Sequence, residues 1–255
     1  MVDEKQKKNH SMDRDRDNLT YIHTTDSLWS PEGRRFQREK YLPRVELVRE
    51  RFGDSFDTIR VLDVGVGYGV FLNLLENEFG LKNIFGMDPF PASIEIAKKY
   101  TSAEIVSGDI NDERWPVPER SFDLITSFDV VEHLAQPAVF FDRAKDYLRP
   151  GGFIIVTTPN RQLPYLMRAI PWFGIPDTNT THINVKRPGY WKRTAREAGY
   201  DIVKAWRGEH LTHTRIFPKL FRNICAALGA DHRKIPIVNS FEQSFCMLLQ
   251  HRQDL

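Results

Sequence analysis

The chain of 255 residues is long enough for one large α/β domain or two small ones with a substantial buried core. Apolar residues make up 41% and charged residues 27%, which is typical of a globular protein and excludes a disordered one. The 36 basic and 34 acidic residues nearly balance, so a nucleic-acid partner would need a local basic patch. The two cysteines, Cys225 and Cys246, are too few for a disulfide scaffold or a cysteine-based zinc site.

The N-terminal stretch, residues 1–18, holds almost no apolar side chains, and we expect a disordered tail there. Its charged residues stand where a secretory signal needs an apolar core. No apolar run elsewhere approaches the ~20 residues that span a bilayer. We therefore expect a cytoplasmic protein in which residues 19–255 form a single domain.

The first expected helix covers residues 35–52 and is interrupted near Pro43, whose ring removes a backbone donor. After it, short apolar runs alternate with helical patterns. Strands are predicted at residues 59–64, 83–88, 103–109, 122–128, 153–159, 200–206 and 244–250. Helices are predicted at residues 70–79, 92–100, 137–148 and 188–198.

This alternation predicts a doubly wound α/β fold, with a seven-stranded, mostly parallel sheet covered by helices on both faces. No helix-length pattern directly precedes residues 244–250, so we expect this last strand to run antiparallel. The fold class is therefore Rossmann-like.

The most informative segment is VLDVGVGYGVFL, residues 61–72, where a strand ends, glycines form a turn and a helix begins. Gly65 and Gly67 let the backbone approach a ligand, and the helix N-terminus offers free N–H groups. The dinucleotide fingerprint would place its third glycine at Val70, so a nicotinamide ligand fits less well. A purely structural turn stays open as an alternative.

Acidic residues close the first three strands, at Asp63, Asp88 and Asp109. Asp88 follows the glycine turn at the distance where a carboxylate accepts hydrogen bonds from both ribose hydroxyls. Asp109 is suited to an exocyclic adenine amine, with the Ile110 amide beside it. Because parallel sheets bind ligands at the carboxyl ends of their strands, we expect these side chains to line one edge.

These motifs resemble those of the class I S-adenosylmethionine-dependent methyltransferases, and the likeness spans most of the chain. Besides VLDVGVGYG, GMDPF and SGDI, the segments FDLITSFDVVEHL and LRPGGFIIVTTPN resemble later motifs that border the reaction centre. The resemblance implies S-adenosylmethionine as the cofactor. The residues that it implies for cofactor binding here are Asp63, Gly65 and Gly67 at the methionine part, Asp88 and Pro89 at the ribose, and Asp109 and Ile110 at the adenine.

A closer resemblance, to the ubiquinone-biosynthesis O-methyltransferases and related small-molecule enzymes, rests on WSPEG, LPR, SFDVVEHL, TPNR and THINVKRPGYWKRTAREAGY. In that group an arginine near the start helps to hold the cofactor carboxylate, and Arg44 is the matching residue at a slightly offset position. Phe128 corresponds to the residue that sits against the cofactor. Some members bind a divalent cation such as magnesium through E-x-x-E-H, which reads Asp129, Glu132 and His133 here, with a shorter first carboxylate.

The same segment supplies the expected catalytic groups. A phenol has a pKa near ~10, so its methylation calls for a base or a cation at the oxygen. His133 is the candidate base because imidazole titrates near neutral pH. Glu132 either binds a metal or tunes that histidine, and His182 is expected to approach from the opposite side.

Two segments that the core does not require, residues 161–181 and 208–243, are expected to form cap insertions. The first is rich in apolar and aromatic side chains and is flanked by Arg161 and Arg168. Such a cap fits an apolar, lipid-like or phenolic small-molecule acceptor and contact with a membrane surface. A helical cap that buries its own aromatic residues is the alternative. The sequence does not indicate an oligomeric state.

Other functions stay open. Metal-assisted RNA 2′-O-methylation shares E-x-x-E-H, but the near-neutral charge argues against an RNA channel, so a nucleic-acid partner is disfavoured. The basic cluster on the helix at 188–198 and just before it is typical of a solvated face; it comprises Lys186, Arg187, Lys192, Arg193 and Arg196. A cofactor-binding protein without turnover is the remaining alternative.

Overall fold

Seven strands form one sheet in the order β3-β2-β1-β4-β5-β7-β6 in the computed structural model, which describes residues 28–159, 181–207, 224, 227–229 and 244–252. The strands are β1 (Val61–Val64), β2 (Ile84–Asp88), β3 (Glu104–Ser107), β4 (Phe122–Phe128), β5 (Leu148–Pro159), β6 (Tyr200–Arg207) and β7 (Ser244–His251). Strands β1 to β5 pair in parallel, and β7 runs antiparallel to both β5 and β6. The predicted fold class and the antiparallel last strand are confirmed.

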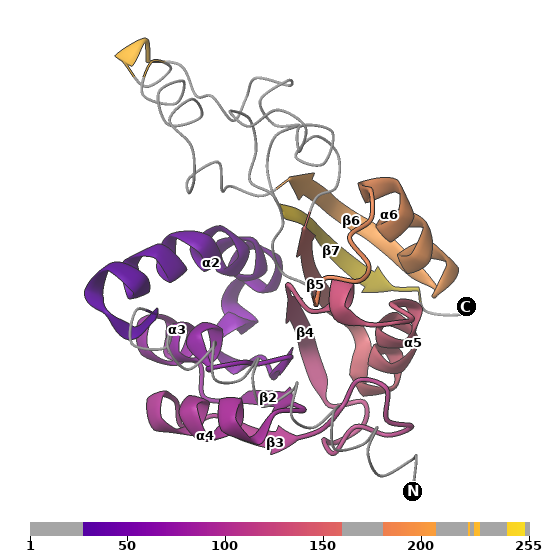
Figure 1. Ribbon diagram of the computed structural model, residues 1–255, viewed down its shortest axis with the longest axis horizontal. Helices are drawn as coiled ribbons and strands as arrows, with labels where there is room; N and C mark the ends of the chain where they lie inside the picture. The colour runs from indigo at the N-terminus through magenta and orange to yellow at the C-terminus, as the bar shows by residue number, and fades with distance from the viewer. Residues whose placement is uncertain (1–27, 160–180, 208–223, 225–226, 230–243, 253–255) are drawn as a thin grey trace, which may run out of the picture.

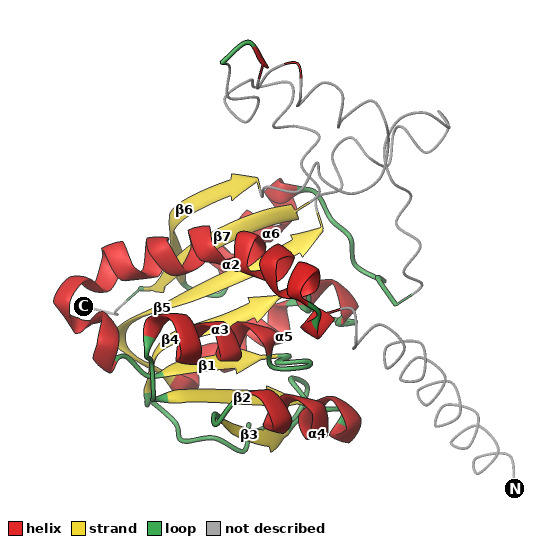
Figure 2. Ribbon diagram, turned by 90° about the vertical axis from the view of Figure 1, so that its left-hand side faces the viewer, coloured by secondary structure: helices red, strands yellow, loops and turns green. Residues whose placement is uncertain are grey.

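Helices cover both faces of this sheet (Figures 1 and 2). The helices are α2 (Pro31–Phe52), α3 (Val70–Phe79), α4 (Pro91–Tyr100), α5 (Ala138–Tyr147) and α6 (Pro188–Glu197), with short 3-10 turns η1 (Gly53–Thr58) and η2 (Val131–His133). Side chains alternate between the two faces of each strand. Val61 and Leu124 therefore join the apolar cluster of α2, α3 and α4, whereas Leu62 and Ile125 join the cluster of α5 and α6.

The first helix departs from the sequence prediction, because it begins at Pro31 and continues through Pro43 to Phe52. The Ser30 hydroxyl caps it by accepting a hydrogen bond from the Gly33 N–H at 3.0 Å. Proline removes one hydrogen bond from the ladder. Burial of Val45 and Val48 against the sheet offsets that loss on the C-terminal side, so the predicted interruption is wrong.

The order in which successive strands are added to the sheet reverses between β1 and β4, which lie side by side although β2 and β3 separate them in sequence (Figure 1). The carboxyl ends of the strands at such a switch point form a crevice for ligands. Across the residues described, no helix combines the length and hydropathy that crossing a bilayer requires. The expected tail at residues 1–18 and nearly all of the two expected cap insertions lie outside the described residues.

Candidate active site

The glycine turn connects β1 to α3 at the switch point. Gly65 and Gly67 both have positive φ, at 79° and 51°, a region that side chains disfavour. A Cβ atom on Gly65 would overlap the Val130 side chain, whereas one on Gly67 would meet nothing within 4 Å. Packing therefore requires the first glycine, and the second leaves the turn open to the approach of a ligand.

Asp88 lies at the end of β2 with 5% of its surface exposed. Its two carboxylate oxygens accept hydrogen bonds from the Gly67 N–H and the Phe90 N–H, each at 2.9 Å. Burial raises the pKa of this carboxyl group despite these hydrogen bonds. Asp88 thus fixes the glycine turn with the same oxygens that are expected to meet the ribose, and Pro89 follows it on the surface.

Asp63 lies in β1 and is buried, with one oxygen accepting a hydrogen bond from the Thr126 hydroxyl at 2.6 Å. Burial raises its pKa to about 7; the Thr126 hydrogen bond opposes this rise, and the charge of Asp88 adds to it. The carboxyl group is therefore an interior link between β1 and β4 that titrates near neutral pH.

Asp109 follows the end of β3 and is half-buried. One of its oxygens accepts hydrogen bonds from the backbone and the side-chain amides of Asn111, at 2.9 and 2.8 Å. Ile110 is buried, and its carbonyl accepts a hydrogen bond from the Trp115 indole at 3.3 Å. The structure thus brings the three sequence-predicted aspartates to one edge of the sheet.

Arg44 of α2 is buried, with 1% of its surface exposed. Its guanidinium donates hydrogen bonds to the Lys40 carbonyl and, at 3.6 Å, to the Cys246 sulfur, while its Nε has no hydrogen-bond partner in the described chain. Its Cζ lies 5.7 Å from the centre of the Phe128 ring, at the end of β4. Among the described residues no carboxylate lies within ion-pair distance of it, so the site holds a buried cation that suits an anionic ligand group.

Asp129 has a left-handed backbone, with φ at 57°, and directly follows Phe128. One carboxylate oxygen pairs with the Lys40 ammonium at 2.8 Å, and the other accepts a hydrogen bond from the Thr157 hydroxyl at 3.1 Å. Burial alone would raise its pKa, but the charge and hydrogen bond of Lys40, with smaller effects of Arg44 and Thr157, lower it to about 2. Sequence analysis missed Lys40, although it lies one helical turn before Arg44.

Glu132, His133 and His182 form a compact group, called here the histidine cluster, in which one ligand atom from each residue lies within 4.8 Å of the others. The two imidazole rings are 4.7 Å apart, and His182 Nε2 lies 3.8 Å from Glu132 Oε1. His182 thus lies beside Glu132 and His133, and its predicted role stays a prediction. Asp129 is not part of this group, because its carboxylate is held by Lys40 and Thr157. The group therefore differs from the predicted metal set, since it contains His182 and lacks Asp129.

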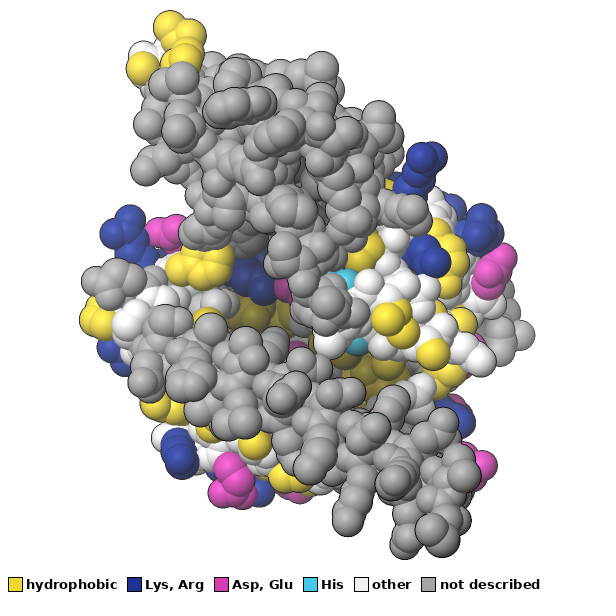
Figure 3. All heavy atoms as spheres, viewed as in Figure 1, with side chains coloured by type: hydrophobic (Ala, Val, Ile, Leu, Met, Phe, Trp, Pro, Cys, Tyr) yellow, Lys and Arg dark blue, Asp and Glu magenta, His cyan; other side chains and the backbone are white. Residues whose placement is uncertain are grey.

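Glu132 is fully buried, and neither carboxylate oxygen has a hydrogen-bond partner within the described chain. Burial, with a further effect from the charge of Asp129, raises its pKa well above the usual range, and smaller effects of the nearby Thr158 hydroxyl and of Lys40 oppose this rise. Burial and the neighbouring His182 lower the pKa of His133. Figure 3 shows histidine atoms near the centre of the face that it draws, among apolar and uncharged atoms.

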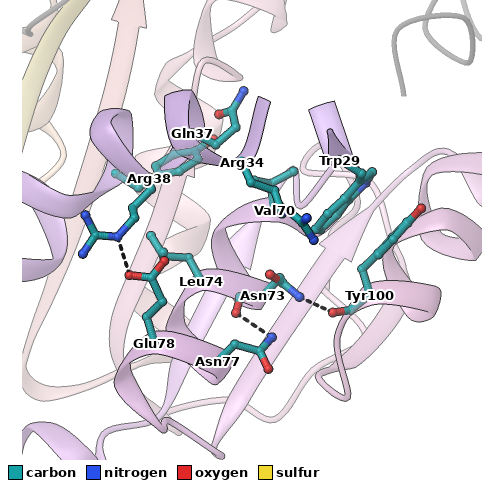
Figure 4. A pocket seen from close by; sticks show the side chains of 11 residues that line it. Trp29, Arg34, Gln37, Arg38, Val70, Asn73, Leu74, Asn77, Glu78 and Tyr100 are labelled. Carbon is teal, nitrogen blue, oxygen red and sulfur yellow. Dashed lines mark hydrogen bonds and ion pairs between the residues drawn. The ribbon is translucent and has the colours of Figure 1, made fainter. Parts of the chain in front are cut away.

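A separate cavity of about 410 Å³ lies between α2 and α3, away from these residues (Figure 4). At one end the rings of Trp29 and Tyr100 stack, with centroids 3.8 Å apart. Arg38 pairs with Glu78 across it at 2.6 Å. None of the residues predicted to bind the cofactor lines this cavity.

Two of the relatives that the chain resembles are ubiquinone biosynthesis O-methyltransferases. A ubiquinone biosynthesis O-methyltransferase of Agrobacterium fabrum is 29% identical over 196 residues, which are 69% of this chain and 77% of that protein. The protein of the same name from Rhizobium etli is 30% identical over 156 residues, covering 56% of this chain. That match spans 62% of the Rhizobium protein, less than two thirds of its length.

Solved structures share the fold at low identity. An S-adenosylmethionine-dependent methyltransferase from Aquifex aeolicus has a TM-score of 0.57 at 15% identity, over 89% of this chain and 96% of that one. The [4+2]-cyclase SpnF has a TM-score of 0.56 at 16% identity, over 83% and 81% of the two chains. At these identities the likeness concerns the fold alone.

The family model described as a methyltransferase domain matches residues 34–205, well over half of the chain, from the first turn of α2 to the later part of β6. The chain therefore belongs to this methyltransferase family and is an S-adenosylmethionine-dependent enzyme.

Proposed function

We propose that this enzyme transfers the methyl group to a hydroxyl oxygen of a small apolar or phenolic acceptor, with His133 as the general base. The observation that carries the proposal is the histidine cluster, where a buried carboxyl group without a hydrogen-bond partner adjoins two imidazoles. Buried polar groups are almost always hydrogen-bonded in folded proteins, so an exception points to a ligand or a chemical role.

The proposed cofactor site comprises the open turn at Gly67, the carboxylate of Asp88, Asp109 with the Ile110 amide, and the buried guanidinium of Arg44. When bound, S-adenosylmethionine supplies an electrophilic methyl group on its sulfonium. Gly65 and Asp63 support the turn and β1 from within, and Pro89 adjoins Asp88. The ring of Phe128 would pack against the cofactor, since it lies beside Arg44.

The hydrogen bonds of His133 favour one form of its ring. Nδ1 lies 3.1 Å from the Thr181 carbonyl oxygen, which can only accept a hydrogen bond, and 3.0 Å from the Thr181 hydroxyl, which can also accept one. In the tautomer proposed here the neutral ring carries its proton on Nδ1, and Nε2 presents the lone pair. Since the pKa of His133 is lowered, this nitrogen is unprotonated near neutral pH and can accept the proton of an acceptor hydroxyl.

The histidine cluster also fits a divalent cation, because two imidazoles and a carboxylate are a common donor set. Glu132, His133 and His182 would hold the ion, and it would polarise the acceptor oxygen. With Nδ1 occupied by Thr181, His133 would offer Nε2 to the ion and lose it as a base. The two roles of His133 therefore exclude each other, and we favour the base.

Two observations support the proposed class of acceptor. The relatives named ubiquinone biosynthesis O-methyltransferases point to an oxygen nucleophile, and the cap insertions predicted at 161–181 and 208–243 suit an apolar, lipid-like molecule. Contact with a membrane surface is part of the same proposal. It predicts flotation with anionic liposomes, and absence of flotation would remove the membrane from the proposal but leave the acceptor class.

RNA is the less favoured acceptor. Lys186 and Arg193 lie over the Tyr190 ring, and Lys192 lies over the Phe245 ring. Three of the five basic side chains in this cluster therefore contact the chain's own aromatic residues. This is typical of a surface on which basic side chains pack their stems and keep their charges in water.

An acceptor panel tests the proposal. Polyprenyl phenols, catechols, amines and short RNAs are each incubated with protein and S-adenosylmethionine, and release of S-adenosylhomocysteine is measured with and without a chelator. We expect release with phenolic acceptors, unaffected by the chelator. Release only with amines or RNA would overturn the acceptor class, and loss of activity with chelator that magnesium or zinc restores would replace the base with a cation.

A further inference from the structure

Lys40 and Asp129 form a shielded ion pair that joins the first helix to the loop after β4. The Lys40 ammonium lies 2.8 Å from an Asp129 carboxylate oxygen, and the two side chains are 18% and 31% exposed. Salt screens such a pair less than it screens exposed charges. Removal of one partner would leave an uncompensated charge at a partly buried position.

Asp129 is also held from the opposite side, by β5. Its backbone N–H donates a hydrogen bond to the Thr157 carbonyl at 3.0 Å, and its carboxylate accepts one from the Thr157 hydroxyl. A left-handed backbone at a residue other than glycine persists only where the surroundings hold it. Lys40 supplies the contact on the α2 side.

The ion pair stands between two groups of the site. Phe128 precedes Asp129 directly, and His133 follows it within the next four residues. Tyr41, next to Lys40 on α2, places its ring 5.3 Å from the Phe128 ring. The same segment of α2 therefore contacts this loop through a charge and through an aromatic ring.

We propose that Lys40 is a positioning residue for methyl transfer: through Asp129 it holds the loop at residues 129–133 against α2, so that Phe128 and His133 keep their places. Lys40 itself touches none of the reacting groups. The catalytic part of this inference rests on the proposed role of His133, whereas its effect on cofactor binding rests on the proposed place of Phe128 and not on the identity of the acceptor. It also means that Asp129 does not serve as a metal ligand, even if the histidine cluster binds an ion.

Another ion pair on α2 provides a matched control. Arg35 and Glu39 lie 3.1 Å apart with side chains 82% and 59% exposed, so this pair belongs to the solvated surface. Exposed pairs of this kind contribute little to stability. Arg35→Met thus removes a cation from the same helix without touching the loop.

The experiment compares Lys40→Met, Lys40→Arg, Asp129→Asn, the double variant Lys40→Met with Asp129→Asn, and Arg35→Met. Turnover at saturating cofactor and acceptor, the two KM values, the cofactor Kd by calorimetry and Tm are measured for each. We expect Lys40→Met to lower kcat about 10- to 100-fold, as displacement of catalytic groups does. Lys40→Arg restores most of that loss, and the double variant is no slower than Lys40→Met alone.

Three results would overturn the inference: unchanged kcat and cofactor Kd in both Lys40→Met and Asp129→Asn, an equal loss in Arg35→Met, or a change confined to Tm. If Lys40→Met does not fold, the near-isosteric Asp129→Asn carries the test. If the unaltered enzyme methylates no acceptor in the panel, the proposed function fails. The inference is then judged on the cofactor Kd, which Lys40→Met must weaken and Arg35→Met must not.

Discussion

Two regions of the site are held by different kinds of contact. One is the edge of the sheet at the carboxyl ends of β1, β2 and β3, and the other is the segment around Asp129 and Glu132. At the edge, Asp88 and Asp109 accept hydrogen bonds from backbone groups of nearby turns. In the second region, Asp129 pairs with a lysine 89 residues earlier, and Glu132 meets His182 from the segment before α6.

This difference separates the region proposed to bind the cofactor from the region proposed to act on the acceptor. Phe90 and Asn111 each lie two residues from the carboxylate that they bond, and Gly67 bonds Asp88 between the adjacent strands β1 and β2. This part of the edge can therefore form as soon as neighbouring strands pair. The proposed acceptor side exists only when α2, β5 and the segment before α6 have all packed onto β4. Substitutions at the edge should therefore affect binding and stability. Those in the second region should affect turnover most, and should also weaken cofactor binding where they displace Phe128.

His133→Ala tests this separation with the largest expected effect. Loss of a general base typically lowers kcat about 100- to 10,000-fold, while the cofactor Kd should stay unchanged because the ring is not part of the edge. Release of S-adenosylhomocysteine at saturating cofactor measures the first and calorimetry the second. His251→Ala is the control, since His251 is a half-buried histidine at the end of β7. Wild-type turnover in His133→Ala would remove the base from the proposal.

The titration of Asp63 gives a pH-dependent prediction for the edge. Its pKa is about 7 in the folded chain, whereas aspartate in an unfolded chain titrates near 4. Between these values only the folded state keeps the proton, so the free energy of unfolding falls as pH rises from about 4 to about 7. Asp63→Asn keeps an acceptor for Thr126 and should remove the part of this fall that Asp63 causes, a gain of about 2–4 kcal/mol at pH 8.

Urea unfolding at pH 5 and pH 8 measures this difference. The same pH dependence in the variant and the unaltered chain would show that Asp63 is not the group responsible. Asp129 has the opposite sign: its pKa is about 2, so its contribution to stability is present above the unfolded value near 4 and is lost as pH falls through 2.

Gly65→Ala should destabilise the turn through packing. The new methyl group would overlap Val130 at a positive φ, and overpacking of this kind costs about 1–3 kcal/mol. Thermal unfolding should show a Tm lowered by about 2–4 °C for each kcal/mol. Gly67→Ala has a similar φ but open space, so it should lower Tm less. Val130→Ala added to Gly65→Ala should recover part of the loss, and no recovery would contradict the overlap.

Asp88→Asn should give the smallest effect. The amide retains one acceptor oxygen but loses the charge, so we expect the cofactor Kd to rise about tenfold, with kcat little changed at saturation. Calorimetry with S-adenosylmethionine measures the Kd. Asp54→Asn, an exposed aspartate in η1, is the control. A larger effect on kcat than on Kd would contradict the proposal that the edge mainly binds the cofactor and the second region mainly serves turnover.

Much of the fold followed from local patterns along the chain. The helix predicted at residues 70–79 is α3 with the same bounds, and the strand predicted at 122–128 is β4. Pro43 misled the prediction because a local rule about a missing donor was outweighed by burial of Val45 and Val48. β5 begins at Leu148, earlier than its apolar run, because Leu148 pairs with Phe122 across a register shift.

The residues of the candidate site also fall into two groups, those that local sequence patterns could place and those that only packing brings together. Gly65, Gly67 and the three aspartates could be placed from sequence because each stands at a strand end, where side-chain direction follows from the strand itself. The shared place of Glu132, His133 and His182 was anticipated only in outline. The partner of Asp129 was missed, since no pattern near either residue encodes a contact 89 positions away.

Short-range chemistry thus accounts for the sheet, the glycine turn and the carboxylates at its edge, because strand periodicity and turn geometry act over a few residues. The protonation of Asp63, the pairing of Lys40 with Asp129 and the burial of the Glu132 carboxyl group beside His182 arise only in the packed molecule. Each depends on exclusion of water by segments from distant parts of the chain, and burial of that kind is a property of the assembled fold.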